Sequence, residues 1–290
     1  MVCLPDELLS SPRWFSQAVS DSGLSNYLNN EGCWLHYLSW GAENARKPAL
    51  LFLHGFRAHA HWWSFIAPLF AQKYCVYALD FSGMGDSDNR SIYSNNTHPD
   101  EILALIDHLG LSSLTAVGHS FGGGRLLRAC RRRNDLFNKL IIIDSHVGFD
   151  GDQYEGDPVQ IQGSRLYDTF EQGISRFRPM PAQDGNMPYL LDYIARHSLC
   201  ELDGKWTWKF DASLSIDPFL RFDGVDLLSS VCCPVDYIYG GNSAVISAQL
   251  AERIFNSLAF PGRLIEVPEA PHHFQLSNPV ALIGILRALL

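Results

Sequence analysis

Short runs of apolar residues alternate along the chain with longer segments in which apolar residues recur at helical spacing. The runs match buried strands of a parallel sheet, which are apolar on both faces because both faces are covered. Strands are predicted at 49–55, 74–80, 114–120, 139–145, 234–241 and 263–269. Helices are predicted between and after them, at 61–72, 99–110, 122–132, 247–258 and 278–290. This alternation indicates an α/β protein with a mostly parallel central sheet flanked by helices.

The alternation of strands and helices is interrupted between Val147 and Val231. This segment shows no clear strand pattern, is rich in Gly, Pro, Gln and aromatic residues, and is too long for an ordinary loop. It is either an irregular insertion packed on the core or a helical cap over the strand ends, where ligands bind in open α/β sheets. The cap interpretation divides the chain into a first core part (1–146), a helical cap (147–231) and a second core part (232–290).

Composition excludes several classes of protein. The chain has 290 residues, of which 47% are hydrophobic and 18% charged, so it can bury a large core and does not resemble a coiled coil. A net charge of −9 disfavours nonspecific binding to nucleic acid. Seven scattered cysteines do not fit a secreted disulfide framework. Since neither a signal-peptide pattern nor an apolar run of about 20 residues is visible, we expect a cytoplasmic protein without a membrane span.

A serine at a strand-to-helix turn carries the strongest catalytic signal. The residues 118–122, Gly-His-Ser-Phe-Gly, match the pattern Gly-x-Ser-x-Gly with Ser120 at its centre. Small residues must flank the serine, because larger side chains would clash with neighbouring backbone in so sharp a turn. The turn lifts the hydroxyl away from the sheet and aims a helix N-terminus at it, which favours developing negative charge. The alternative is a glycine turn that serves packing alone.

Three motifs together resemble the α/β-hydrolase family. They are LFLHGF at 51–56, LDFSGMGDSD at 79–88 and GHSFGG at 118–123. In that family the corresponding segments are the oxyanion loop, the loop after the next strand, and the turn that carries the nucleophile. The resemblance covers most of the chain, and the segments that match the sheet flank a central insertion, as in cap-bearing members. It is more specific for the fold than for the reaction.

The family order of nucleophile, acid and histidine implies a base on the loop after the last strand. A serine hydroxyl needs such a base, and histidine suits the task near neutral pH. The loop supplies His272 and His273. The usual histidine of the family is followed seven positions later by a proline, a spacing that His272 and Pro279 satisfy. We therefore expect His272 to be the base and His273 to be a packed neighbour.

The acid departs from the usual pattern of the family. Most members place an aspartate shortly after the penultimate strand, where this chain reads Gly-Gly-Asn-Ser at 240–243. A buried carboxylate is needed to orient the imidazole and to stabilise the imidazolium. Some relatives take it from the end of the strand after the nucleophile helix, which is Asp144 here, and Asp144 is the predicted acid. Asn242 as a neutral orienting group and Asp150 from the cap are the alternatives.

The resemblance also implies an oxyanion hole formed by the backbone N–H groups of Phe56 and Phe121, whose rings would wall the pocket. Arg57 could meet an anionic substrate group, although an exposed loop arginine is the favoured interpretation. Trp206 and Trp208 alternate with period two in KWTWKFD, and either line the pocket or pack the cap on the core.

The predicted function is that of a carboxylesterase-like serine hydrolase. It would cleave small-to-medium carboxylic esters with an apolar part through an acyl-enzyme on Ser120. No metal or other cofactor is predicted, because no carboxylate accompanies His54, His59 and His61 at ligand spacing. A serine nucleophile argues against epoxide hydrolases and haloalkane dehalogenases of this fold, which use an aspartate. A carbon–carbon bond hydrolase, a lactonase, a thioesterase and a non-catalytic ligand receptor are the alternatives.

Overall fold

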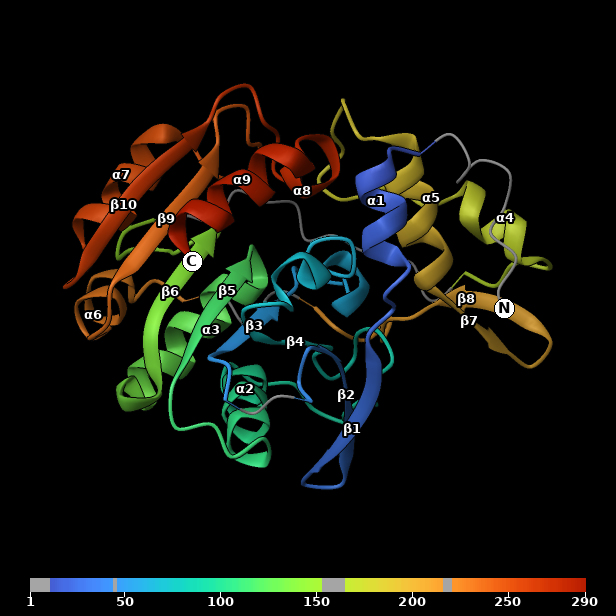
Figure 1. Cartoon of the computed structure of the whole chain (residues 1–290), viewed down its shortest axis with the longest axis horizontal. Coiled ribbons are helices and arrows are strands. Elements are labelled where there is room, and N and C mark those ends of the chain that lie inside the picture. The colour runs from blue at the N-terminus through green and yellow to red at the C-terminus, as the bar shows by residue number, and fades with distance from the viewer. Residues whose placement is uncertain (1–10, 44–45, 153–164, 216–220) are drawn as a thin grey trace.

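A computed structural model describes residues 11–43, 46–152, 165–215 and 221–290 of the chain. Its centre is an eight-stranded sheet with the order β1-β2-β4-β3-β5-β6-β9-β10 (Figure 1). The strands are β1 (Leu24–Asn30), β2 (Cys33–Trp40), β3 (Ala49–Leu53), β4 (Cys75–Leu79), β5 (Leu114–His119), β6 (Phe137–Ile143), β9 (Val235–Gly240) and β10 (Pro261–Val267). The pairs β1–β2 and β2–β4 are antiparallel, and all other neighbours are parallel. The prediction of a mostly parallel sheet is confirmed.

Each of the predicted strands is present, with ends that differ from the prediction by at most two residues. The antiparallel hairpin β1–β2 at the edge of the sheet was not predicted. Its tight turn is formed by Glu31 and Gly32, which have positive φ angles of 54° and 83°. This geometry matches the right-handed twist of the two strands and is typical of two-residue hairpin loops.

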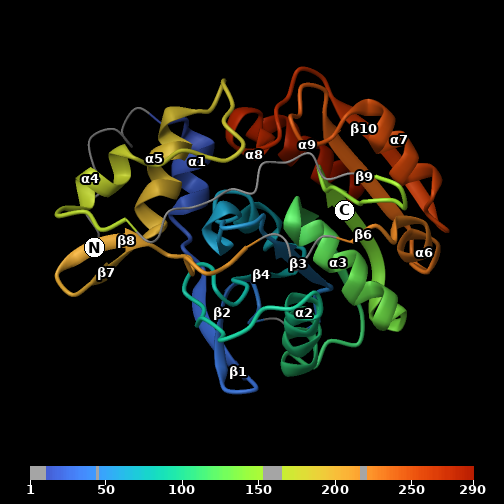
Figure 2. The ribbon, with the colours of Figure 1, turned by 180° about the vertical axis from the view of Figure 1, so that it is seen from behind.

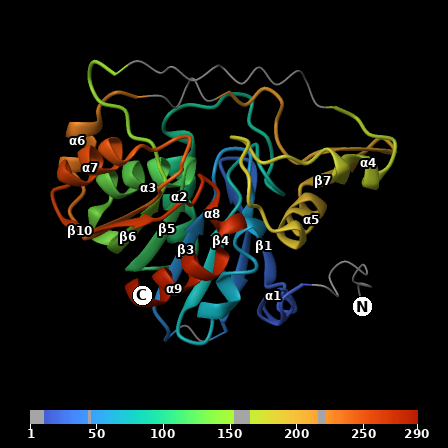
Figure 3. The same cartoon turned by 90° about the horizontal axis from the view of Figure 1, so that it is seen from above.

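Helices cover both faces of the sheet, as Figures 2 and 3 show. One face carries α2 (Thr97–His108), α3 (Phe121–Arg132), α6 (Gly224–Ser229) and α7 (Ala248–Asn256), and the other carries α1 (Arg13–Val19) and α9 (Pro279–Leu289). Successive strand residues alternate between the two layers. Leu51 is buried with the first set of helices, whereas Leu50 and Phe52 are buried with the second. The strands are therefore apolar throughout because each side chain enters one of two cores.

The segment 61–72, predicted as a helix, instead forms two 3₁₀ helices, η2 (Ala60–Trp62) and η3 (Ala67–Phe70). Pro68 provides the physical reason, because it lacks an N–H donor and its ring obstructs the preceding turn of an α-helix. The aromatic side chains of the segment still enter the core: Trp63 and Phe65 are fully buried. Another 3₁₀ helix, η4 (Asn134–Leu136), leads into β6.

The segment predicted as a cap holds both helices and strands. It contains α4 (Phe170–Ser175), α5 (Pro188–His197), β7 (Leu199–Leu202), β8 (Lys205–Trp208) and α6. The prediction that it has no strand was wrong, since β7 and β8 form an antiparallel hairpin around Asp203 and Gly204. The elements α4, α5, β7 and β8 lie together beside α1 (Figure 1). The division of the chain into core and cap stays a prediction.

The short helix α8 (Phe274–Ser277) connects the loop after β10 to α9. Within the described residues, no helix combines the length and the apolar character that crossing a bilayer requires.

Candidate active site

Ser120 occupies a strained turn between β5 and α3. Its φ and ψ angles are 51° and −120°, outside the regions that most residues adopt. The flanking glycines explain how the turn fits. A Cβ atom on Gly118 would lie 2.6 Å from the Cα of Gly123, and one on Gly122 would lie 2.5 Å from the carbonyl oxygen of His54. Each distance is too short for a side chain, so the Gly-x-Ser-x-Gly pattern is a steric requirement of this turn.

His272 approaches Ser120 from the loop between β10 and α8. Its Nε2 atom lies 2.9 Å from the Ser120 Oγ, although the two residues are 152 positions apart in sequence. The His272 side chain is buried, whereas Ser120 is partly exposed. This distance allows the imidazole to accept the hydroxyl proton directly.

Asp144 lies immediately after β6 and contacts the other ring nitrogen of His272. Its Oδ2 is 2.5 Å from the His272 Nδ1. The carboxylate is fully buried, and its Oδ1 accepts a hydrogen bond of 2.9 Å from the backbone N–H of Gly240. Both ring nitrogens of His272 are thus engaged by Ser120 and Asp144. In the described part of the chain, neither of the alternatives Asn242 and Asp150 bonds to that ring.

Ser243 is a residue of this site that the sequence analysis did not identify. Its hydroxyl donates a 2.5 Å hydrogen bond to the Asp144 Oδ2. Ser243 stands where most family members carry their aspartate, so this position orients the carboxylate instead of supplying it. A hydroxyl-bearing residue at the position of a missing acid is the signal that could have revealed this role.

Two further imidazoles surround His272. The rings of His119 and His273 lie 4.9 Å and 4.6 Å from it, centre to centre. His119 Nε2 is 3.1 Å from the His272 carbonyl oxygen, and His273 Nε2 is 2.8 Å from the Met180 carbonyl oxygen. Burial lowers the pKa of His273 to about 3 and that of His119 well below its ordinary value. Both are therefore neutral near pH 7 and add no positive charge beside His272.

The same three histidines form a cluster of potential metal ligands. Their ligand atoms lie within 4.8 Å of one another. However, the His272 nitrogens are engaged by Ser120 and Asp144, and Gln275 lies within hydrogen-bond distance of His119 Nδ1 at 3.3 Å. A metal ion would have to displace these partners, so the donor set does not fit an open metal site.

The predicted oxyanion residues Phe56 and Phe121 both lie next to Ser120. Phe121 is the first residue of α3, and its ring is 5.4 Å from that of Phe56. The loop that carries Phe56 packs on Ser120: a Cβ atom on Gly55 would lie 3.5 Å from the Ser120 Cβ. Phe121 directly follows Ser120 in the chain and Phe56 directly follows Gly55, so both backbones lie close to Ser120.

Buried polar contacts hold this loop in place. The Asp80 carboxylate, at the end of β4, accepts a 2.5 Å hydrogen bond from the N–H of Ala60 and lies 2.7 Å from His36 Nδ1. Burial alone would raise the pKa of Asp80, but the hydrogen bond with His36 and the nearby histidines hold it below its ordinary value. Asp80 is therefore a charged acceptor that anchors the loop after β3.

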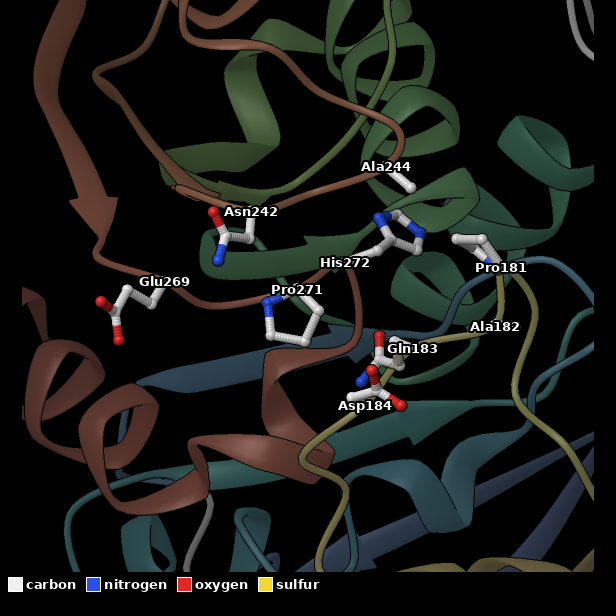
Figure 4. Close-up of a pocket in the computed structure, with 9 residues that line it drawn as sticks. All are labelled: Pro181, Ala182, Gln183, Asp184, Asn242, Ala244, Glu269, Pro271 and His272. Atoms are coloured by element: carbon white, nitrogen blue, oxygen red, sulfur yellow. The ribbon is translucent and has the colours of Figure 1, made fainter.

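A cavity of about 250 Å³ opens beside His272 (Figure 4). Its walls are Pro181, Ala182, Gln183, Asp184, Asn242, Ala244, Glu269, Pro271 and His272. The side chains of Asp184 and Glu269 are exposed, which makes its surroundings acidic. The cavity gives solvent a route to the imidazole edge.

The three predicted pocket residues differ in their surroundings. Arg57 is not the exposed loop arginine that was favoured: it is half-buried, because residues 210–214 fold over it. The Trp206 ring packs 4.6 Å from that of Phe170, and the Trp208 ring 5.7 Å from that of Tyr167. Both tryptophans thus attach the β7–β8 hairpin to the region around α4, and neither lines the cavity beside His272.

Comparisons with known proteins agree with this architecture. Residues 48–178 match the family model described as alpha/beta hydrolase fold. An esterase of Mycobacterium tuberculosis is 27% identical over 264 residues, which cover 87% of this chain and 85% of that protein. The strigolactone esterase of Arabidopsis thaliana is 26% identical over 254 residues, which cover 83% of this chain and 92% of that protein. The crystal structure of the M. tuberculosis esterase has a TM-score of 0.72 at 21% identity, covering 100% of this chain and 99% of that chain.

Proposed function

We propose that this chain, which belongs to the α/β-hydrolase fold family, is a serine esterase that hydrolyses small-to-medium carboxylic esters. The observation that carries the proposal is the continuous path of hydrogen bonds from the Ser120 hydroxyl through His272 to Asp144. Its two links measure 2.9 Å and 2.5 Å. A relay of this kind serves to activate a hydroxyl group that is otherwise a weak nucleophile near neutral pH.

In the acylation step, the Ser120 oxygen attacks the ester carbonyl carbon while His272 Nε2 takes the hydroxyl proton. Asp144 holds the ring with Nδ1–H toward its carboxylate and stabilises the imidazolium that forms. The imidazolium then returns the proton to the leaving alcohol oxygen, and the ester carbon–oxygen bond breaks. The product of this step is an acyl-enzyme on Ser120 and a free alcohol.

The negative oxygen of the tetrahedral intermediate is bound by the backbone N–H groups of Phe56 and Phe121. Donors of this type each contribute about 2.7–4 kcal/mol to the transition state. In deacylation, the oxygen of a water molecule attacks the acyl carbon while His272 takes a proton from it. The bond between the acyl carbon and the Ser120 oxygen then breaks, His272 returns the proton to that oxygen, and the carboxylic acid leaves. The cavity beside His272 is the proposed route for this water, because it reaches the imidazole from solvent.

Two relatives with esterase names support ester cleavage over the other reactions considered. The rings of Phe56 and Phe121 favour a substrate with an apolar portion next to the scissile carbonyl. A small-molecule ester is therefore the proposed substrate class.

A panel of 4-nitrophenyl esters of increasing acyl length tests the proposal. The wild-type protein is expected to release 4-nitrophenol, and Ser120→Ala to lower kcat by at least about 10⁴-fold. Ser257→Ala, which removes an exposed hydroxyl on the far end of α7, is the matched control and should retain wild-type turnover. Failure of the wild-type protein to hydrolyse any ester of the panel would contradict the proposal and favour a ligand receptor.

A further inference from the structure

Arg57 lies at the junction between the loop after β3 and the chain that follows β8. Its guanidinium carbon is 5.1 Å from the ring centre of Phe56 and 5.0 Å from that of Phe210. One of its nitrogens, Nη2, donates a 2.6 Å hydrogen bond to the carbonyl oxygen of Leu214. The guanidinium is thus held between two aromatic rings, one of which belongs to a proposed oxyanion residue.

The Arg57 side chain is incompletely satisfied. Its Nε and Nη1 atoms are buried and have no hydrogen-bond partner. Among the described residues, no carboxylate lies within ion-pair distance of it. The nearby Asp211 carboxylate accepts hydrogen bonds from Tyr93 and Ser213 instead. Asp211 offsets part of the Arg57 charge without bonding to it. The buried Nε and Nη1 donors still lack an acceptor, which a bound anion could supply.

The group stays charged in spite of its burial. Burial lowers the pKa of Arg57 to about 10, which is still well above neutral pH. A further arginine, Arg125, is buried and lies over the other ring, with its guanidinium carbon 4.9 Å from the ring centre of Phe121. Two arginine cations therefore flank the pair of phenylalanines whose backbone borders Ser120.

The position of Arg57 is fixed by its backbone as well as by its side chain. Its N–H lies 3.1 Å from the Met84 sulfur. Met84 in turn pairs with Phe210 in an antiparallel bridge, where the backbone N–H of Gly85 donates a 2.8 Å hydrogen bond to the Lys209 carbonyl oxygen. A cation held in this way is preorganised, which lowers the entropy lost when an anion binds.

We propose that Arg57 binds a carboxylate carried by the acyl part of the substrate. Each paired edge of the planar guanidinium combines Nη2 with either Nε or Nη1. Because Nη2 carries two N–H groups and uses one for Leu214, one edge is left to match the two oxygens of a carboxylate. The Phe56 ring is a neighbour of both the guanidinium and the Phe121 ring, so a short hydrocarbon chain packed on these rings would join that carboxylate to the carbonyl at Ser120. The substrate class is then a monoester of a dicarboxylic acid. This inference rests on the proposed esterase activity and specifies its substrate.

The test compares two substrates that differ only in the charge of the distal group. One is the mono-4-nitrophenyl ester of adipic acid, and the other is the same ester with its free carboxylate capped as a methyl ester. In the wild-type protein, kcat/KM is expected to be at least about 10-fold higher for the charged ester. Arg57→Gln should lower this ratio by about 10- to 100-fold, mainly through KM, because a buried hydrogen bond to a charged group is lost. Arg57→Lys, which keeps the charge but not the planar group, should give an intermediate ratio.

Arg133→Gln is the matched control, since it removes one positive charge from an exposed arginine at the end of α3 that pairs with Asp135. It should leave the ratio unchanged. The inference would be overturned if the kcat/KM ratio of the charged to the capped ester were the same in the wild-type protein and in Arg57→Gln. A preference of the wild-type protein for the capped ester would also overturn it, and that measurement does not depend on the folding of a variant. If the wild-type protein hydrolysed neither substrate, that result would instead contradict the proposed function.

Discussion

The two sides of the candidate active site are held together by different kinds of contact. On the side of the sheet, Ser120, His272 and Asp144 are linked by hydrogen bonds of 2.5–2.9 Å, and the carboxylate has further donors in Gly240 and Ser243. On the side of the insertion, the loop at Arg57 meets residues 210–214 through aromatic rings and a guanidinium with two unpartnered nitrogens. On the first side, the three linked residues have hydrogen-bond partners within the chain. On the second side, two nitrogens of Arg57 have none.

From this difference we infer that the sheet side determines the reaction and that the insertion side determines which substrate binds. Strands β5, β6 and β9 are paired in parallel register, so the residues at their ends cannot move independently of one another. Catalytic geometry benefits from such rigid support, because small displacements of the reacting groups are costly. An incomplete set of partners, by contrast, leaves interactions for a substrate to supply.

The largest expected effect comes from Asp144→Asn, which removes the negative charge beside His272 but keeps the size and shape of the side chain. Asparagine cannot hold the reactive tautomer of His272 or stabilise its cation, so kcat on 4-nitrophenyl butyrate should fall by about 10³–10⁴-fold. Asp150→Asn, at an exposed aspartate of the insertion, should leave kcat unchanged. Thermal unfolding of both variants should remain cooperative. Near-wild-type turnover of Asp144→Asn would transfer the orienting role to Asn242 or to the insertion.

Acid should destabilise the surroundings of the site, because two buried neutral histidines pack against His272 and Phe121. Burial lowers the pKa of His273, beside His272, and of His98, beside Phe121, to about 3 in the folded chain. In the unfolded chain each protonates near its ordinary value of about 6.5. The stability that each contributes is therefore present above pH 6.5 and is lost as the pH falls toward 3. At pH 5 the loss is about 2 kcal/mol for each histidine.

Urea unfolding at pH 7 and pH 5 measures this loss. His273→Asn should reduce the difference in unfolding free energy between the two pH values by about 2 kcal/mol. His108→Asn, at an exposed position near the end of α2, should leave the difference as it is in the wild-type protein. An undiminished difference in His273→Asn would mean that its imidazole is not kept neutral by burial.

Ser243→Ala should produce a smaller effect on the same side of the site. It removes one of the donors to the Asp144 Oδ2 while the N–H of Gly240 still bonds to Oδ1. We expect kcat to fall by about 10-fold, corresponding to the loss of one hydrogen bond to a charged group. Ser243→Thr, which keeps the hydroxyl, should restore most of the activity. If the alanine variant were as impaired as Asp144→Asn, Ser243 would be more than an orienting donor.

The smallest effect on turnover is expected from a change inside the insertion. Phe170→Ala removes the ring on which Trp206 packs and so loosens the β7–β8 hairpin. Because no residue of the sheet side is touched, kcat on 4-nitrophenyl acetate should stay within about threefold of the wild-type value. Limited proteolysis should nevertheless cleave the variant faster between residues 165 and 215. A loss of turnover comparable to that of Asp144→Asn would show that the two sides are not separable.

The residues of the sheet side could be proposed from sequence because apolar runs indicated the strands and the resemblance to the α/β-hydrolase family indicated the roles. Asp144 illustrates this: it closes an apolar run typical of a buried strand, and some members of that family take their acid from this strand end. Two hairpins were missed although their turns, Glu31-Gly32 and Asp203-Gly204, are of the kind that two-residue loops require. The predicted helix at 61–72 failed at Pro68, where local chemistry overrides hydrophobic spacing.

Arg57 could not be placed from sequence for a different reason. Its environment is made by Phe210 and Leu214, more than 150 positions away, and no local pattern encodes that contact. The same holds for Trp206 and Trp208, whose alternation reveals a shared face but not what the face contacts. Residues whose surroundings depend on the insertion are therefore the ones for which sequence patterns are least informative.

The central claim is that Ser120 is a nucleophile activated by His272, and covalent labelling tests it most directly. After incubation with a fluorophosphonate, intact-mass measurement should show one adduct per chain, and peptide mapping should place it on Ser120. His272→Ala should abolish or strongly slow the labelling, while His108→Ala should not. An adduct on another residue, or labelling of equal rate in His272→Ala, would contradict the account.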